Sequence, residues 1–263
     1  MTHVSGKRLG GLILGALVLS WTGCGSSDDE ADLPLQPPLA TKTFTLDMAP
    51  GVSMAFVAIP PGRFWMGGGS GGLKRRRVTV ARPYYLGKCE VTQQQWMTVM
   101  DHNPSVEGKG PQFPVSHLDW KDCQEFLRRL NQKYGGKTGM KFDLPTEAQW
   151  EYACQANSND ADDAESAPVF AWMGSNSGND PHPVGQKMPN IWGLHDMLGN
   201  VCEWCADRVD KRGKSIHDGE LHVVRGGCWH DGASECNCRA RVERKATVPL
   251  RVMDGMRVVC VPK

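Results

Sequence analysis

The sequence has little net charge, a formal +1, since 30 Lys and Arg residues nearly balance 29 Asp and Glu residues in a chain of 263. This balance excludes a histone-like polycation and an acidic disordered tail. The short basic run at residues 74–77 is typical of a solvated loop before a strand. We therefore expect no nucleic-acid partner.

Long apolar runs are also scarce, which excludes a multi-span membrane protein. The apolar run at residues 9–21 is shorter than the ~20 residues that a transmembrane helix needs. It follows Lys7 and Arg8 and leads to Cys24, in the order of an export signal followed by a lipobox. We predict a signal peptide at residues 1–23 and lipidation of Cys24. Trp21 stands where a lipobox usually has Leu, so ordinary secretion stays open.

Residues 24–43 are rich in Ser, Asp and Pro, which predicts a flexible tether. The lipid on Cys24 would make the membrane a partner of the chain. Gly25, and not Asp, follows Cys24, which indicates the outer membrane of a cell envelope, on either its periplasmic or its surface face.

Several catalytic and metal-binding patterns are missing. The eight His residues form no H-x-x-x-H pair. The glycine run GGGSGG at residues 67–72 lacks the Lys and the context of a phosphate-binding loop and is typical of a flexible segment, so its G-x-S-x-G match does not indicate a nucleophile elbow. Cys202 and Cys205 have the spacing of half a zinc site, but no second pair completes it. Ten cysteines in an exported chain favour disulfides, and removing Cys24 leaves an odd number.

The remaining sequence predicts one irregular α+β domain at residues 44–263. Capping boxes at Thr92, Asp119 and Thr146 each predict a helix, and Gly135-Gly136 is expected to end the second. Short apolar segments predict strands, and we place these at residues 54–59, 78–80, 223–224 and 257–259. Thirty Gly and nine Trp residues indicate many loops anchored by large aromatic side chains.

Asp196 and Glu203 flank a Gly-Asn turn, seven residues apart. Calcium prefers several oxygen ligands, and a turn supplies carbonyls beside the carboxylates. By spacing alone, two solvated acids on a surface turn are favoured over a calcium site.

Six phrases in order resemble the formylglycine-generating-enzyme (sulfatase-modifying factor) family. The most recognisable is LPTEAQWEYAC at residues 144–154. The others lie at residues 59–67, 84–93, 189–201, 224–227 and 255–257. The resemblance implies a single compact α+β domain with little regular secondary structure, related to the C-type lectin fold.

The resemblance also implies metal sites. A structural calcium ion would be held by Asp196, Gly199, Val201 and Glu203. Family enzymes bind copper(I) through two cysteines and oxidise a sulfatase cysteine to formylglycine. Here the second position matches Cys236, but the first is Asp231, a hard ligand that suits copper(I) poorly. The sequence disfavours the ergothioneine-forming branch, because it lacks that branch's histidine pattern and extra length.

Two further departures from the family pattern predict a disulfide. Cys202 stands where the family usually has Trp, and Cys228 where it usually has Ser. Both positions adjoin one region of the family fold, which implies a Cys202–Cys228 disulfide. Cys205–Cys236 and Cys154–Cys238 are further candidate pairs.

The same scaffold occurs in lipid-anchored variable proteins, whose last segment carries the ligand surface. That segment matches residues 228–254 here. The expected surface consists of Trp229, His230, Asp231, Glu235, Asn237, Arg239 and Arg241. We therefore expect a ligand- or protein-binding module. A purely structural lipoprotein domain and a copper-dependent or related non-heme metal oxidase, using Cys236, remain open.

Overall fold

The structure is a computed structural model that describes residues 42–69, 74–156, 165–210, 221–246 and 252–263. The predicted signal peptide, and the predicted tether as far as residue 41, lie outside the described residues. Among the described residues, no helix has the length and apolar character to cross a membrane.

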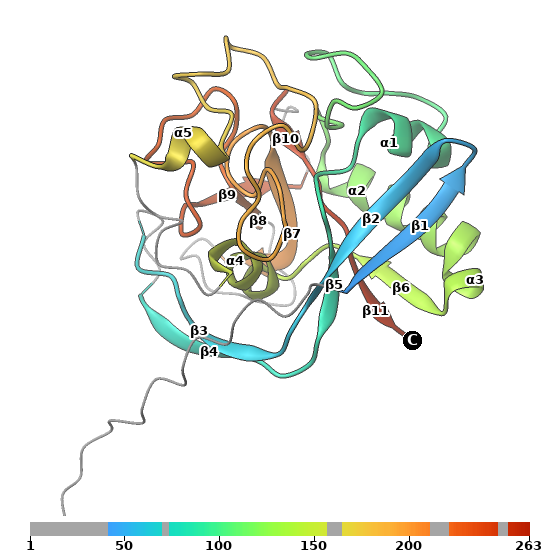
Figure 1. Ribbon diagram of the computed structural model, residues 1–263, viewed down its shortest axis with the longest axis horizontal. Coiled ribbons are helices and arrows are strands. Elements are labelled where there is room, and N and C mark those ends of the chain that lie inside the picture. Colours follow the sequence, from blue (N-terminus) through green and yellow to red (C-terminus); the bar gives the residue numbers. More distant parts are fainter. Residues whose placement is uncertain (1–41, 70–73, 157–164, 211–220, 247–251) are drawn as a thin grey trace, which may run out of the picture. The chain divides into compact units, whose positions relative to one another are not determined.

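The larger sheet has five antiparallel strands, in the spatial order β1-β2-β5-β11-β6. Figure 1 shows β11, the last strand of the chain, lying between β5 and β6. The strands are β1 (Thr43–Ala49), β2 (Val52–Ile59), β5 (Tyr84–Gly87), β6 (Met140–Asp143) and β11 (Val259–Pro262). Because β11 pairs with both β5 and β6, it joins β6 to the rest of the sheet.

A second sheet carries most of the residues discussed below. Its order is β10-β7-β8-β9, and only the β10–β7 pair is parallel. The strands are β7 (Cys202–Val209), β8 (Leu221–Arg225), β9 (Arg241–Lys245) and β10 (Asp254–Gly255). A separate hairpin pairs β3 (Gly62–Met66) with β4 (Arg76–Val80).

All three predicted capping boxes are present, at the starts of α1 (Gln93–Val99), α2 (Trp120–Leu130) and α4 (Glu147–Gln155). Each N-cap side chain accepts a hydrogen bond from the third helical N–H, and that third residue's side chain accepts one in return. Local sequence therefore determines where these helices begin. A short helix, α5 (Ala167–Phe170), lies later in the chain.

The predicted end of the second helix is wrong. The backbone stays helical at Gly135 and Gly136 and continues through a π-helical turn, η1 (Asn131–Gly135), into α3 (Gly136–Thr138). It ends at Gly139, whose φ of 67° is the left-handed conformation that favours glycine. The Tyr134 hydroxyl donates to the carbonyl of Met48 at 2.7 Å, which ties this extension to β1.

The predicted strands at residues 54–59, 78–80 and 223–224 lie within longer strands, β2, β4 and β8. The strand predicted at residues 257–259 begins only at Val259. Arg257 lies before the strand, and its fully buried guanidinium donates to Glu203. The family fold predicted from the sequence is thus observed, an α+β domain dominated by strands and loops.

The buried apolar side chains form two cores. In one, Trp96 stacks on Phe126 with ring centroids 4.9 Å apart, which joins α1 to α2. In the other, Tyr152 of α4 packs edge-on against Trp192 at 5.0 Å. One tryptophan thus packs α1 against α2, and another packs its loop against α4.

Candidate functional site

The predicted calcium site consists of three residues of the turn before β7, Asp196, Gly199 and Val201, and of Glu203 at the start of β7. Asp196 and Asn200 have φ values of 53° and 54°, and Gly199 has φ of 71°. A Cβ atom on Gly199 would lie 2.1 Å from the carbonyl oxygen of Trp172, so only glycine fits there. The turn is therefore tight and fixed by its sequence.

The two acids of the predicted calcium site are buried, so they are not solvated acids on a surface turn. Asp196 is 2 % exposed and Glu203 is 1 % exposed. One carboxylate oxygen of Asp196, Oδ2, accepts from the N–H of Gly185 at 2.6 Å. The other, Oδ1, is buried and has no hydrogen-bond partner. A buried carboxylate oxygen that has no hydrogen-bond partner is available to bind a cation.

Glu203, by contrast, already has partners for both oxygens. Arg257 donates to them at 2.7–3.0 Å, and the indole N–H of Trp150 donates to Oε2 at 2.6 Å. Arg257 also donates to the carbonyl oxygens of Gly87 and Asp196. The guanidinium therefore fixes the predicted calcium ligand Glu203 in an ion pair.

A third buried acid, Glu90, completes this cluster. Its carboxylate accepts from the side chain of Asn200 at 2.7 Å and from the N–H of Val201 at 2.9 Å. Burial raises the pKa of Glu90 well above its ordinary value, and burial also raises the pKa of Asp196. Arg257 pairs with the carboxylate of Glu203 and acts on those of Glu90 and Asp196 through its charge alone, so that full ionisation of the three acids would exceed the charge of Arg257 by two. The sequence offered no sign that Glu90, more than 100 positions away, belongs here.

The copper positions of the family do not offer two opposed sulfurs. The thiol of Cys236 is buried, faces the carbonyl of Cys228 at 3.5 Å, and has its pKa raised by burial. The Asp231 carboxylate accepts instead from the N–H of Cys228 at 3.1 Å. Asp231 is thus a hydrogen-bonded residue of the turn after β8.

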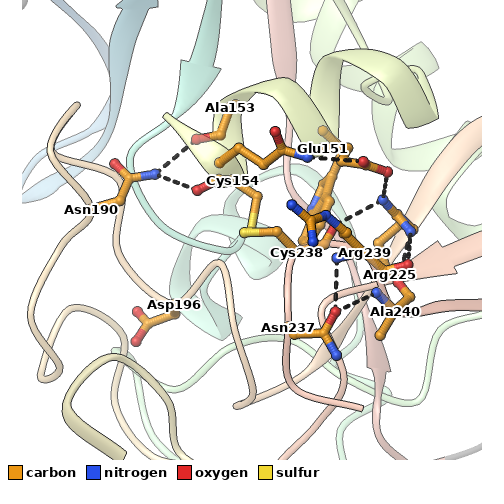
Figure 2. Close-up of a disulfide and its surroundings, with 12 residues drawn as sticks. Glu151, Ala153, Cys154, Asn190, Asp196, Arg225, Asn237, Cys238, Arg239 and Ala240 are labelled. Carbon is orange, nitrogen blue, oxygen red and sulfur yellow. Dashed lines mark hydrogen bonds and ion pairs between the residues drawn. A yellow bond between two sulfur atoms is a disulfide. The ribbon is translucent and has the colours of Figure 1, made fainter. Parts of the chain in front are cut away.

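Among the candidate disulfides, the structure contains Cys154–Cys238, which links α4 to the segment before β9 (Figure 2). The predicted Cys202–Cys228 bond is not formed, and both residues are free thiols. Their sulfurs lie within 4.8 Å of each other, so the region is shared as expected but the covalent bond is absent. Cys205 and Cys236 are also free thiols.

Only some residues of the predicted ligand surface are exposed. Trp229 and Arg241 are buried, and Arg241 forms an ion pair with Glu147 at 2.7 Å. His230 and Glu235 are exposed, while Asp231, Asn237 and Arg239 are half-buried. The last segment of the chain therefore contributes to the core as well as to the surface.

A cavity of about 140 Å³ beside the disulfide was missed by sequence reasoning. Its lining is mainly apolar and includes Phe170, Met188, Ile191, Leu194, Met197, Leu198, Cys154, Cys238 and Asp196. Met188 and Ile191 are 59 % and 56 % exposed, so apolar side chains reach the surface at this place. In Figure 2 the side chain of Asn190 holds one wall by donating to the carbonyls of Ala153 and Cys154.

Comparisons with known proteins agree with this architecture. Residues 48–261 match the model of the sulfatase-modifying factor enzyme 1-like domain. The chain is 32 % identical to the chaperone protein LppX of Paenibacillus barcinonensis over 204 residues, covering 59 % of this chain and 71 % of LppX. It is 31 % identical to the formylglycine-generating enzyme of Streptomyces coelicolor over 166 residues, covering 53 % of this chain and 49 % of the enzyme.

Among solved structures, Treponema denticola variable protein 1 superposes with a TM-score of 0.73 and 26 % identity, covering 83 % of this chain and 98 % of that protein. The match to the domain model spans most of the chain, and the fold, the turn before β7 and α4 are all in place. The chain therefore belongs to the family of sulfatase-modifying factor enzyme 1-like domains.

Proposed function

We propose that this chain is a binding module for an apolar side chain or a small apolar ligand, and that it does not oxidise protein cysteine. The observation that carries this proposal is the cavity beside the Cys154–Cys238 disulfide, with Met188 and Ile191 exposed at the surface. Apolar cavities of similar size, ~150 Å³, accommodate benzene. Cys238 connects the cavity to the predicted ligand segment, of which Asn237 and Arg239 are half-buried.

The donor set supports binding over copper oxidation. A carboxylate at position 231 is a poor ligand for copper(I), and burial raises the pKa of the Cys236 thiol, which disfavours the thiolate that copper(I) binds. LppX is named as a chaperone protein and the Treponema relative as a variable protein. The alternative, a formylglycine-generating oxidase, draws its support from relatives such as the Streptomyces enzyme.

The binding test compares two neutral probes, N-acetyl-phenylalaninamide and N-acetyl-alaninamide, by saturation-transfer NMR. We expect the phenylalanine probe alone to bind, because its ring fits the apolar cavity. The Ile191→Asp substitution should weaken this binding at least roughly tenfold, since it places a charge beside the apolar wall. The matched control is Met97→Asp on α1, where a methionine is 47 % exposed away from the cavity lining.

Equal binding of both probes, or equal losses in the two variants, would contradict the proposed site. A separate assay tests the alternative function. If the purified chain, loaded with copper(I), converts the cysteine of a Cys-x-Pro-x-Arg peptide to an aldehyde, the oxidase function holds and ours does not.

We further propose that the domain is anchored to the outer membrane of a cell envelope through a lipid on Cys24. The support is the order of basic residues, apolar run and cysteine at the start of the sequence. A tether between Cys24 and β1 would hold the binding domain beside the membrane.

A structural calcium ion is proposed at the turn before β7. Asp196 Oδ1, which is buried and unpartnered, supports this site, as does the excess of buried carboxylates over Arg257. The carbonyls of Gly199 and Val201 would supply further oxygens. Glu203 is engaged by Arg257, so we assign it a supporting role through the ion pair.

Calcium is expected to raise the unfolding temperature of the chain, and EDTA to lower it. An ion at 100 times its dissociation constant contributes about 2.7 kcal/mol to the free energy of unfolding. Asp196→Asn should abolish this response, whereas Asp101→Asn, at a 91 % exposed side chain, should keep it. An unfolding temperature that ignores calcium, or a response retained in Asp196→Asn, would rule out this ion.

A further inference from the structure

Three metal-binding side chains meet at the start of β7. The Sγ atoms of Cys202 and Cys228 and a carboxylate oxygen of Asp231 all lie within 4.8 Å of one another. Cys202 opens β7, while Cys228 and Asp231 belong to the turn that follows β8. In a tetrahedral zinc site with Zn–S of about 2.3 Å and Zn–O of about 2.0–2.2 Å, neighbouring donor atoms lie roughly 3.5–3.8 Å apart. The three atoms therefore need only a small closure to share one ion.

The backbone holds these three residues in place. The N–H of Cys228 donates to Asp231 Oδ2 at 3.1 Å, and the N–H of Asp231 donates to the carbonyl of Cys228 at 3.0 Å. Gly227 begins this turn with φ of 70°, and a Cβ atom there would lie 2.9 Å from the sulfur of Cys236. The turn is thus closed on itself, with Cys228 and Asp231 on a common side.

A further sulfur lies beside the cluster. The thiol of Cys228 contacts Sδ of Met253 at 3.0 Å. Met253 directly precedes β10, and its carbonyl accepts from the N–H of Cys202 at 2.9 Å. The cluster therefore joins three segments far apart in sequence, namely β7, the turn after β8, and the approach to β10.

Burial makes this cluster a site and not a group of surface acids. Cys228 is 0 % exposed and Cys202 is 3 % exposed, while Asp231 is half-buried. A bound cation would replace the protons of the two thiols and bind both sulfurs and the carboxylate at once.

We propose that Cys202, Cys228 and Asp231 bind one Zn²⁺ ion, with Met253 shielding the open side. Two thiolates with one carboxylate form a ligand set that zinc accepts, whereas copper(I) disfavours the carboxylate. Binding exchanges two thiol protons for the ion: Zn²⁺ plus two S–H groups gives two Zn–S bonds and releases two H⁺, with no electron transferred. The ion would tie β7 to the turn after β8, independently of the cavity and of calcium.

The test uses the full chain, reduced and stripped of metal by a chelator, then titrated with Zn²⁺ at constant pH. We expect one Zn²⁺ per chain by native mass spectrometry and two protons released per ion. Substituting Co²⁺ should give thiolate-to-cobalt charge-transfer absorption. These readouts use the unmodified chain, so they stand even if a variant fails to fold.

Variants then assign the ligands. Cys202→Ser or Cys228→Ser should weaken zinc binding by more than roughly 100-fold, because losing a ligand exceeds the 10–100-fold cost of losing an outer-shell partner. Asp231→Asn should weaken it less and leave the cobalt–thiolate absorption in place. The control is Cys89→Ser, at a half-buried thiol outside the cluster.

Four results would overturn the proposal. These are the absence of a retained zinc ion, zinc affinity unchanged in Cys202→Ser, preferential retention of copper(I) when both metals are offered, and isolation of the pair as a Cys202–Cys228 disulfide that the metal does not prevent.

Discussion

Replacing Arg257 by Met is expected to lower the free energy of unfolding by about 3–5 kcal/mol, the usual cost of removing one member of a buried ion pair. The substitution leaves Glu203 without its bidentate partner and leaves the carbonyls of Gly87, His195 and Asp196 without a donor. Glu90 and Asp196 would also lose a compensating positive charge. Urea unfolding at pH 7, with EDTA present to remove any contribution from calcium, measures the loss.

The control is Arg128→Met on the solvent face of α2. Arg128 donates to Glu125 at 2.7 Å, but its side chain is 62 % exposed, and surface pairs of this kind contribute little. Arg257→Lys should fall between the wild type and Arg257→Met, because it keeps the charge but not the planar fork. If Arg257→Met unfolds at the same urea concentration as Arg128→Met, the buried cluster does not stabilise the fold.

Removing the disulfide should have an effect of similar size. Cys154 and Cys238 are separated by 84 positions, and the chain-entropy relation gives about 4.5 kcal/mol for a loop of that length, within a usual range of about 2–5 kcal/mol. The double variant Cys154→Ala, Cys238→Ala is therefore expected to unfold at much lower urea concentration. Its unfolding should also depend more steeply on urea, because the unlinked unfolded chain exposes more surface.

A matched control for this loss is Cys89→Ala, which removes a free, half-buried thiol and no cross-link. Because both disulfide sulfurs belong to residues that line the cavity, the double variant should also bind the phenylalanine probe more weakly. A double variant as stable as Cys89→Ala would mean that the disulfide adds nothing to the packing of α4 against the last segment.

Sequence reasoning was accurate where the signal is local. The capping boxes at Thr92, Asp119 and Thr146 each begin a helix as predicted, since the partners in each box are three residues apart. The ordered family phrases predicted the fold class, which the structure and the domain match both confirm. The glycines at 135 and 136 misled the prediction, because glycine permits the end of a helix without requiring it.

What the sequence determined by itself is thus the family, the helix starts and the identity of the residues around the turn before β7. Only the tertiary structure decided which cysteines are bonded, that Glu90 and Arg257 join Asp196 and Glu203, and that Cys202, Cys228 and Asp231 converge. The physical reason is separation along the chain. Glu203 and Arg257 are 54 positions apart and Cys154 and Cys238 are 84 apart, and no local pattern specifies which distant side chains the packed sheets bring into contact.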